Sequence, residues 1–457
     1  MLSVLLKRIL LVGTLLAACG SPHLSTALTM GEAVERALRN DPVYLGAAAE
    51  LGVSQARSSQ AFSALMPQLS ASVNASRNRR DYSQNTAGGI PNNVLENYNS
   101  DSAQLNFTQP LWHLDNYFAM READSVVAQS DQLLLSAGQD VLVRLAQAWF
   151  DIMQAHDEIL LAESKAKLAR YQLDQAIREQ AKGVMSLTDS ELARGKHEVA
   201  IAEQSAAEAQ LNIKLAALEQ IIGPAVITLP PELPENPVMP MHKGESFEHW
   251  GKLAEEHNPA ILAARYALNA ANEEVRKRYA GHEPTLDIVA SYGKSAQGAG
   301  ITGGQAGFSS KTNTVGVQFN VPLFSGGGQV AKVREANALK EKAAQDLELA
   351  IRNARSSVKQ DWFTWASSDS MQAAAGQNMK STAFALKGAE LGKARGIKSG
   401  LDVLQAQVQF DIAARDFRKA QYDAFMSYFK LLAVTGQLNG TELMRLDRLA
   451  GSSDRSR

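Results

Sequence analysis

The stretch Phe107-Thr108-Gln109-Pro110-Leu111-Trp112 recurs 212 positions later (322 − 110) as Phe319-Asn320-Val321-Pro322-Leu323-Phe324. In each copy, a short segment of alternating polarity ends in Pro-Leu-aromatic, and a long helical pattern follows. The alternation predicts a β-strand, and the pattern after it predicts a very long α-helix. We interpret Pro110 and Pro322 as the joints at which a strand passes into a helix.

The whole chain repeats in the same register. Equivalent residues stay 213 or 217 positions apart, and the pairs are Pro42 and Pro259, Pro67 and Pro284, Trp149 and Trp362, Gly183 and Gly396, Asp189 and Asp402, and Gly223 and Gly436. This indicates one architecture encoded twice. We divide the chain into a leader at 1–27, a first repeat at 28–223, a Pro-rich linker at 224–244, a second repeat at 245–436, and a C-terminal segment and tail at 437–457.

Each repeat contains two segments with one apolar and one small polar face, at 69–76, 102–108, 285–292 and 314–321. Strands of about ten residues can cross a bilayer when tilted. Residues 77–100 are polar and rich in turn formers, which predicts a flexible loop between the first two strands. Since bacterial membrane barrels start at about eight strands, four cannot close on themselves, and the strands of other copies must complete them.

Each repeat also contains a long rod that ends at Gly183 or Gly396, followed by a helix of about half its length. We therefore predict two helical hairpins with these glycines at their tips. Apolar residues spaced alternately by three and four predict a coiled-coil seam on the first rod, at Leu145, Ala148, Ile152, Ala155, Ile159, Ala162, Ala166, Ala169, Leu173 and Ala176. Similar stripes run along the return helices, at Val199, Ala202, Ala206, Ala209, Ile213 and Ala216, and at Phe410, Ala413, Phe417, Ala420, Ala424 and Leu431. The tail after Gly436 is short and charged, and we expect its end to fray.

Composition excludes several functions. The 457 residues carry a net charge of −2 and only 6% aromatic residues, so a nucleic-acid surface is not expected. The sequence contains no nucleotide-binding loop, no zinc-protease or nucleophile-elbow motif and no paired cysteines, which predicts neither an enzyme nor a cofactor or metal site. The run His156-Asp157-Glu158 is interpreted as a solvated helix face rather than a ligand set.

The first residues have the pattern of an export leader, with Lys7 and Arg8 before an apolar run from 9 to 18. Two processing points fit. Leu16-Ala17-Ala18-Cys19 resembles a lipobox, in which Cys19 would be lipidated, whereas Ser25-Thr26-Ala27 suits an ordinary signal peptidase. Cys19 is the only cysteine, so no disulfide is expected within the chain.

Taken together, these features resemble the TolC family of outer-membrane channel-tunnels, over about residues 28 to 446. The resemblance is carried by Gly281-His282-Glu283-Pro284-Thr285-Leu286-Asp287, Val321-Pro322-Leu323-Phe324-Ser325-Gly326-Gly327 and Gly396-Ile397-Lys398-Ser399-Gly400-Leu401-Asp402-Val403-Leu404. It implies an α+β membrane protein: a homotrimer with a twelve-stranded β-barrel in the outer membrane of a Gram-negative bacterium. The barrel would continue into an α-helical coiled-coil barrel in the periplasm, with the linker and C-terminal segment in an equatorial belt.

The resemblance also implies a passive exit duct for a tripartite efflux pump or a type I secretion system. Its partners would be a periplasmic adaptor and an inner-membrane transporter of the RND, ABC or MFS class. The sequence alone does not distinguish small-molecule efflux from protein secretion. A soluble periplasmic coiled-coil scaffold is the alternative.

In that family the hairpin tips close the periplasmic entrance. By resemblance, Asp189 matches the acidic partner of a link between neighbouring coils, Lys398 matches the basic partner, and Asp402 forms an acidic ring. Gln405 stands where close relatives have a second acidic residue. From the residues alone, Asp189 and Asp402 also suit the first turn of a helix, where a carboxylate serves as a cap.

Overall fold

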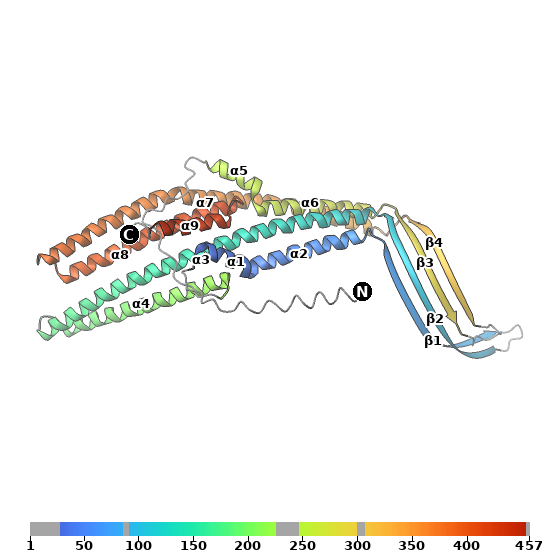
Figure 1. Ribbon diagram of the computed structural model, residues 1–457, viewed down its shortest axis with the longest axis horizontal. Coiled ribbons are helices and arrows are strands. Elements are labelled where there is room, and N and C mark those ends of the chain that lie inside the picture. The colour runs from blue at the N-terminus through green and yellow to red at the C-terminus, as the bar shows by residue number, and fades with distance from the viewer. Residues whose placement is uncertain (1–27, 86–90, 225–245, 299–306, 454–457) are drawn as a thin grey trace, which may run out of the picture.

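The computed structural model describes residues 28–85, 91–224, 246–298 and 307–453. Figure 1 shows a long bundle of helices that lie along a common axis, with a curved sheet at one end. The predicted leader, including Cys19, and the predicted linker from 225 onward lie outside the described residues.

The elements follow the repeat. Their bounds are α1 Met30–Asn40, α2 Pro42–Ser63, β1 Gln68–Asn85, β2 Pro91–Trp112, α3 Leu114–Ala181, α4 Leu187–Ile222, α5 Phe247–His257, α6 Pro259–Ala280, β3 Thr285–Gln297, β4 Phe308–Asn320, α7 Gly328–Ala394, α8 Gly400–Val434 and α9 Gly440–Ser453. At about 1.5 Å per residue, the 68 residues of α3 make a rod about 100 Å long.

The sheet has four antiparallel strands in the order β1-β2-β3-β4. The predicted loop at 77–100 is wrong over its described part, because β1 and β2 stay paired from Gln68 and Thr108 out to Asn85 and Pro91. Beyond Gln297, which faces Ser100, β3 no longer accompanies them. A two-stranded ribbon beyond the apolar band has no apolar face that would require alternation, so the period-two signal disappears there although the strands continue.

Close to the sheet the helices pack side by side and continue from its end. Further away they form two hairpins (Figure 1). Near the sheet, α3 packs between α2 and α6, and α6 packs against α7. Further away, α3 pairs with α4 and α7 pairs with α8, and α8 also contacts α3 (Figure 1). In the described part of the chain, no helix is long and apolar enough to cross a membrane.

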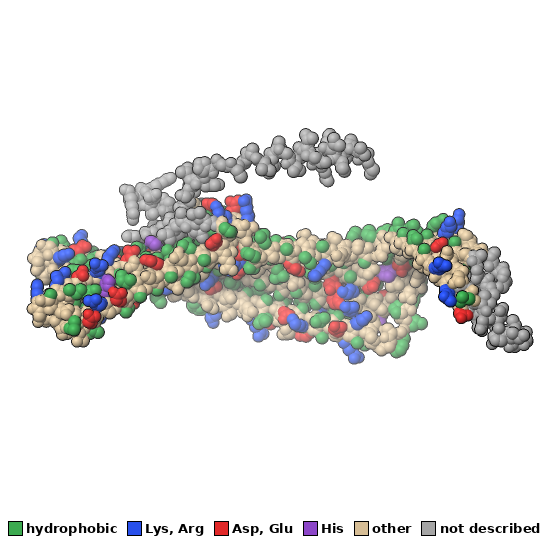
Figure 2. Space-filling model, turned by 90° about the horizontal axis from the view of Figure 1, so that it is seen from below, with side chains coloured by type: hydrophobic (Ala, Val, Ile, Leu, Met, Phe, Trp, Pro, Cys, Tyr) green, Lys and Arg blue, Asp and Glu red, His purple; other side chains and the backbone are tan. Residues whose placement is uncertain are grey.

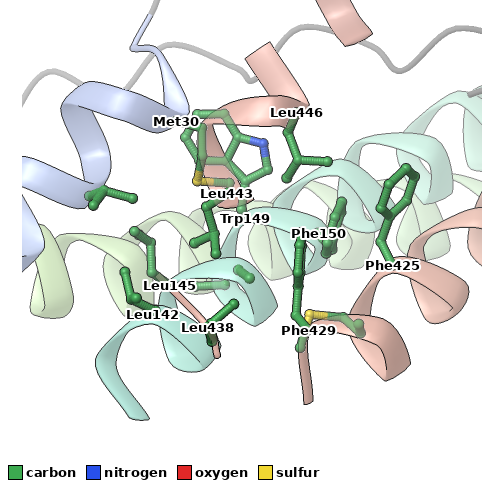
Figure 3. Close-up of a cluster of buried hydrophobic side chains, with 14 of the residues drawn as sticks. Met30, Leu142, Leu145, Trp149, Phe150, Phe425, Phe429, Leu438, Leu443 and Leu446 are labelled. Carbon is green, nitrogen blue, oxygen red and sulfur yellow. The ribbon is translucent and has the colours of Figure 1, made fainter. Parts of the chain in front are cut away.

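The main hydrophobic core lies where α1, α3, α8 and α9 meet, about midway along the rods (Figure 3). Met30 lies beside Trp149 and the leucines of α9, and Phe150 faces the aromatic side chains of α8. The ring of Phe150 stacks on Tyr422, Phe425 and Phe429 at centroid distances of 5.5, 6.0 and 6.5 Å. Fully burying each such side chain contributes about 1.5–3 kcal/mol, so this cluster fixes the two repeats to each other.

The C-terminal segment belongs to this core through Leu443 and Leu446, whereas the end of the tail, at residues 454–457, lies outside the described residues. Leu443 and Leu446 of α9 are buried against α1. The carboxylate of Asp447 accepts hydrogen bonds from the backbone N–H groups of Met30 and Gly31, at 2.8 and 2.9 Å. Asp447 thus caps the first turn of α1, whose N–H groups have no partner within the helix. The packing of α9 on α1 could not be predicted from the sequence, because charged residues surround Leu443 and Leu446.

The predicted seams differ in what covers them. On α3 the seam is mostly buried, and on α8 Ala413, Phe417, Ala424 and Leu431 are buried. On α4 the predicted stripe is exposed, including Val199 at 59% and Ile213 at 56%, because α4 turns Ala200 and Leu218 toward α3 instead. A second apolar stripe on α4 therefore faces away from its own hairpin.

Candidate functional site

Both hairpin tips lie at the end of the molecule opposite the sheet (Figure 1). Each is built on the same turn. Gly183 and Gly396 adopt left-handed backbone conformations with φ of 72° and 74°, which disfavour a side chain. The next residue closes the turn: Val184 N–H donates to Glu179 O at 3.0 Å, and Ile397 N–H donates to Gly392 O at 2.8 Å. The two predicted tip glycines are thus both placed at tips.

A serine begins each returning helix, and an aspartate follows three residues later. Ser186 Oγ accepts from Asp189 N–H at 3.1 Å and donates to Asp189 Oδ2 at 2.8 Å. In the second tip, Asp402 Oδ2 accepts from Ser399 N–H at 2.7 Å and from Ser399 Oγ at 2.8 Å. In both tips the serine is the N-cap. The Asp402 carboxylate completes a capping box by accepting from a backbone N–H, as the sequence predicted, whereas the Asp189 carboxylate accepts only from the Ser186 hydroxyl.

The cap also keeps Asp402 ionised. The backbone N–H of Ser399 and then its hydroxyl hold the pKa of the Asp402 carboxyl below its usual range, and nearby Lys398 acts in the same direction. A carboxylate that accepts hydrogen bonds from such donors stays charged in mildly acidic solution. Asp402 is thus suited to a permanent negative charge at the tip.

The remaining predicted tip residues do not meet within one chain. Asp189, Lys398 and Gln405 are exposed, and among the described residues no ion pair joins Asp189 to Lys398. The stem of Lys398 lies against Gly392, where an added Cβ would come within 2.6 Å of its Cγ. Any link between Asp189 and Lys398 therefore requires a neighbouring chain or a movement of one hairpin.

Sequence reasoning missed a contact between the two hairpins near the tips. Tyr171 on α3 packs against Gly400, the first residue of α8, and a Cβ at position 400 would lie 2.7 Å from the Tyr171 hydroxyl. A glycine at the start of a helix suggested only a tip turn. The contact joins residues 229 positions apart (400 − 171), and no local pattern reports it.

A second missed contact lies further up the same two helices. Asp157, interpreted above as part of a solvated face, is buried and forms an ion pair of 2.7 Å with Arg418, while Tyr422 Oη donates to it at 3.3 Å. Burial raises the pKa of Asp157 above its usual range, and the charge of Arg418 opposes that rise. Next to it, Arg415 Nη1 lies 3.1 Å from Glu158 Oε1. These pairs hold α8 against α3 above the tips.

The predicted strand-to-helix joints differ in length. Pro110 lies inside β2, next to an irregularity in its pairing with β3, and α3 begins only four residues later. Pro322 lies outside β4, and α7 begins six residues later, after Gly326 and Gly327 with left-handed φ of 62° and 81°. At the first joint, His113 Nε2 lies 3.0 Å from Asp287 Oδ1, which ties the start of α3 to β3.

No group of three or more potential metal ligands is present among the described residues. The tips therefore offer fixed charges and contacts between hairpins. Such an arrangement can close or open a passage and favour ions of one sign.

Comparisons with known proteins identify the family. The family model described as "Outer membrane efflux protein" matches residues 33–224 and 250–437. Among curated relatives, the alkaline protease secretion protein AprF of Pseudomonas aeruginosa is 28% identical over 419 residues, covering 91% of this chain and 86% of AprF. The outer membrane protein TolC of Escherichia coli is 26% identical over 449 residues, covering 97% and 89%.

Solved structures share the fold. The CmeC outer membrane channel of Campylobacter jejuni superposes with a TM-score of 0.71 at 18% identity, covering 92% of this chain and 89% of CmeC. The outer membrane protein VceC of Vibrio cholerae gives 0.68 at 18% identity, covering 89% and 96%.

Proposed function

The chain belongs to the outer membrane efflux protein family, and we propose that three copies of it close into a single exit duct. The protein is located in the outer membrane of a Gram-negative bacterium and extends into the periplasm. It serves efflux or type I secretion as a channel and is not an enzyme. The alternative of a soluble periplasmic scaffold is therefore set aside.

The open edges of the sheet carry the trimer proposal. In the described chain, β1 and β4 each pair on one side only. An unpaired edge within lipid costs several kcal/mol for each unsatisfied backbone group. Three chains supply twelve strands, in which β4 of one chain pairs with β1 of the next. The exposed apolar stripe on α4 supports the same arrangement, since a neighbouring coil would cover it.

We place the gate at the tips of this trimer. Asp189 of one chain and Lys398 of a neighbour would form the links that hold the tips together. Each exposed pair contributes only about 0–1 kcal/mol, but three copies act on one closed state. Three copies of Asp402 would form an acidic ring that favours cations. Gln405 contributes no charge to a second ring.

The duct works with the other components of an efflux or secretion machine. A periplasmic adaptor and an inner-membrane transporter of the RND, ABC or MFS class are the proposed partners. The relatives AprF and PrtF are named as protease secretion proteins. We therefore propose an exported protein as the first cargo to test.

Single-channel conductance in planar bilayers tests the gate. Neutralising both link residues, D189N with K398Q, removes the attraction between neighbouring tips, and we expect conductance to rise. The matched control is K342Q with D346N, an exposed pair of the same charges on α7 at 2.7 Å, which should leave conductance at the wild-type value. Equal conductance of the D189N/K398Q and control channels would overturn the gate at the tips.

A further inference from the structure

The register of the sheet defines its lipid-facing side. Leu69 faces Phe107, Phe107 faces Ala290, and Ala290 faces Val315, so these residues share one face. The apolar band on that face consists of Leu69, Ala71, Val73 and Ala75 on β1, Ala103, Leu105 and Phe107 on β2, Leu286, Ile288, Ala290 and Tyr292 on β3, and Val315, Val317 and Phe319 on β4. The opposite face carries mostly Ser, Thr, Asn and Gln, as expected for the lumen of a channel.

Along β1, β3 and β4, basic residues follow the apolar residues on the same face, toward the end away from the helices; in the register Lys294 lies opposite Ala103, nearer the helices than Arg77 and Arg79. Arg77 and Arg79 come next after Ala75 on β1. Lys294 comes next after Tyr292 on β3, and Lys311 lies at the corresponding end of β4. We call Arg77, Arg79, Lys294 and Lys311 the basic belt. In Figure 2, blue side chains lie over the sheet beside the grey residues at its far end.

The charges of the belt are not balanced within the chain. All four side chains are exposed, and in the described residues none of them forms an ion pair. The described acidic residues on this face of the strands are Asp101 and, further out, Asp81. The belt therefore carries a positive excess of two in each chain (4 − 2).

One contact in the belt is unfavourable on its own. Lys294 and Lys311 are direct partners in the β3–β4 register and lie on the same face. Like charges directly opposite each other destabilise a strand pair. A bound anion between the two ammonium groups would reverse the sign of this contribution. The pair is thus a second observation, independent of the count of charges, that indicates an anionic ligand.

The position of the belt identifies the ligand. The helices extend into the periplasm, so the far ends of the strands lie at the outer surface of the outer membrane. The belt adjoins the acyl-chain band there, at the level of the lipid head groups. In the outer leaflet of this membrane the head groups are those of a phosphorylated glycolipid.

We propose that the basic belt binds the phosphate groups of the outer-leaflet glycolipid, with one phosphate between Lys294 and Lys311 and others at Arg77 and Arg79. The belt lies on each chain's own sheet. Only its continuity around the barrel rests on the proposed trimer.

Titration of purified protein in nonionic detergent with diphosphoryl lipid A tests this. We expect wild-type protein to bind it with an affinity that falls as salt is added. The neutral variant R77Q/R79Q/K294Q/K311Q should bind at least about tenfold more weakly, since each cation near a charged lipid surface contributes severalfold. The charge-preserving variant R77K/R79K/K294R/K311R should stay within about threefold of the wild type. Equal affinity of the neutral variant and the wild type, or of lipid A and its dephosphorylated form, overturns the proposal.

The double variant K294Q/K311Q removes only the opposed pair and gives a second readout. Without lipid its melting temperature should rise above the wild-type value, because a repulsion is lost. With lipid A its gain in melting temperature should be smaller than that of the wild type. If lipid A raises the melting temperature of K294Q/K311Q as much as that of the wild type, no phosphate binds between Lys294 and Lys311. None of these readouts measures conductance or strand pairing, so failure of the duct proposal would be seen separately.

Discussion

At the scale of single residues, small side chains at the tips decide how closely the two hairpins approach. Gly400 leaves room for the Tyr171 hydroxyl, and Gly392 leaves room for the stem of Lys398. Gly392 lies inside α7, where a glycine costs about 1 kcal/mol relative to alanine, and Gly400 is the first residue of α8. The close contacts account for their presence there.

Substituting Gly400 tests the contact. In G400A the new Cβ would lie 2.7 Å from the Tyr171 hydroxyl, so the tyrosine must swing away and the hairpins lose this contact. We expect a higher single-channel conductance. The control G388A lies on α7 of the same hairpin. It places a Cβ where nothing lies within 4 Å and should conduct like the wild type. If the two variants conduct alike, the Tyr171–Gly400 contact does not hold the tips closed.

A buried charge pair holds the corner between α1 and α2. Asp41 accepts from both terminal nitrogens of Arg144 on α3, at 2.8 and 3.0 Å, and caps α2 by accepting from Tyr44 N–H at 2.9 Å. Asp41 is 2% exposed and Arg144 34%. The hydrogen bonds from Arg144 hold the pKa of Asp41 below its usual range.

We expect D41N to lower the free energy of unfolding by about 2 kcal/mol, because Arg144 loses its buried partner while Asn keeps the cap. The folded pKa of Asp41 is depressed, so its contribution is fully present above about pH 4 and is lost as pH falls further. The wild-type advantage should therefore be constant from pH 7 to 5. The control D140N removes an exposed partner of the same arginine, 2.7 Å away, and should cost under about 1 kcal/mol. Equal losses for the two variants in chemical unfolding would count against the buried pair.

The residues at the tips divide into predictable and unpredictable ones. The turn at Gly183 and Gly396 and the caps at Ser186 and Ser399 depend on neighbours within five positions, so the local sequence reports them. Arg418 and Asp157 are 261 positions apart (418 − 157). The sequence around each of them predicts only a charged side chain on a solvent-exposed helix face. Only the packing of α8 on α3 shows that they are partners.

At the scale of elements, the lengths of the helices limit what the N-terminus can reach. Met30 is fixed beside Trp149, which lies 35 positions along α3 from its start at Leu114 (149 − 114). At about 1.5 Å per residue, this places Met30 about 50 Å from the sheet. The nine positions between Cys19 and Leu28 (28 − 19) span at most about 32 Å when fully extended.

A lipid on Cys19 could therefore not enter the outer membrane while Leu28 and Met30 remain in the core. We predict processing after Ala27, with no acyl group on the mature protein. The intact mass of the protein purified from outer membranes checks this, and C19S should reach the outer membrane in the same amount. A mass that includes Cys19 with its acyl chains would contradict the prediction.

The elements themselves were largely predictable, because both rods and the four membrane-level strands have strong periods. The sequence failed where a period was missing or ambiguous. The polar ribbon of β1 and β2 does not alternate, and α9 is too short and charged to be recognised. The predicted seam on α4 is wrong within one chain, because Ala200 and Leu218 face α3 and the predicted stripe is exposed.

At the scale of the whole molecule, a single chain leaves three features without a partner. Its sheet has two open edges, its α4 stripe is exposed, and its predicted gate residues Asp189 and Lys398 do not meet. The proposed neighbouring copies would account for all three features. The internal repeat gives each chain two hairpins, so three chains would surround the passage with six.

The pairing of β4 with β1 of the next chain is the central claim, and disulfide cross-linking tests it most directly. In a C19S background, S72C on β1 is combined in turn with T312C, T314C or G316C on β4, all on the polar face. Within one chain these positions lie at opposite edges of the sheet. We predict that at least one pair yields covalent trimers, with no species beyond the trimer, on nonreducing gels of oxidised outer membranes. Monomers in all three pairs, or a ladder that continues past three chains, would contradict a closed trimeric duct.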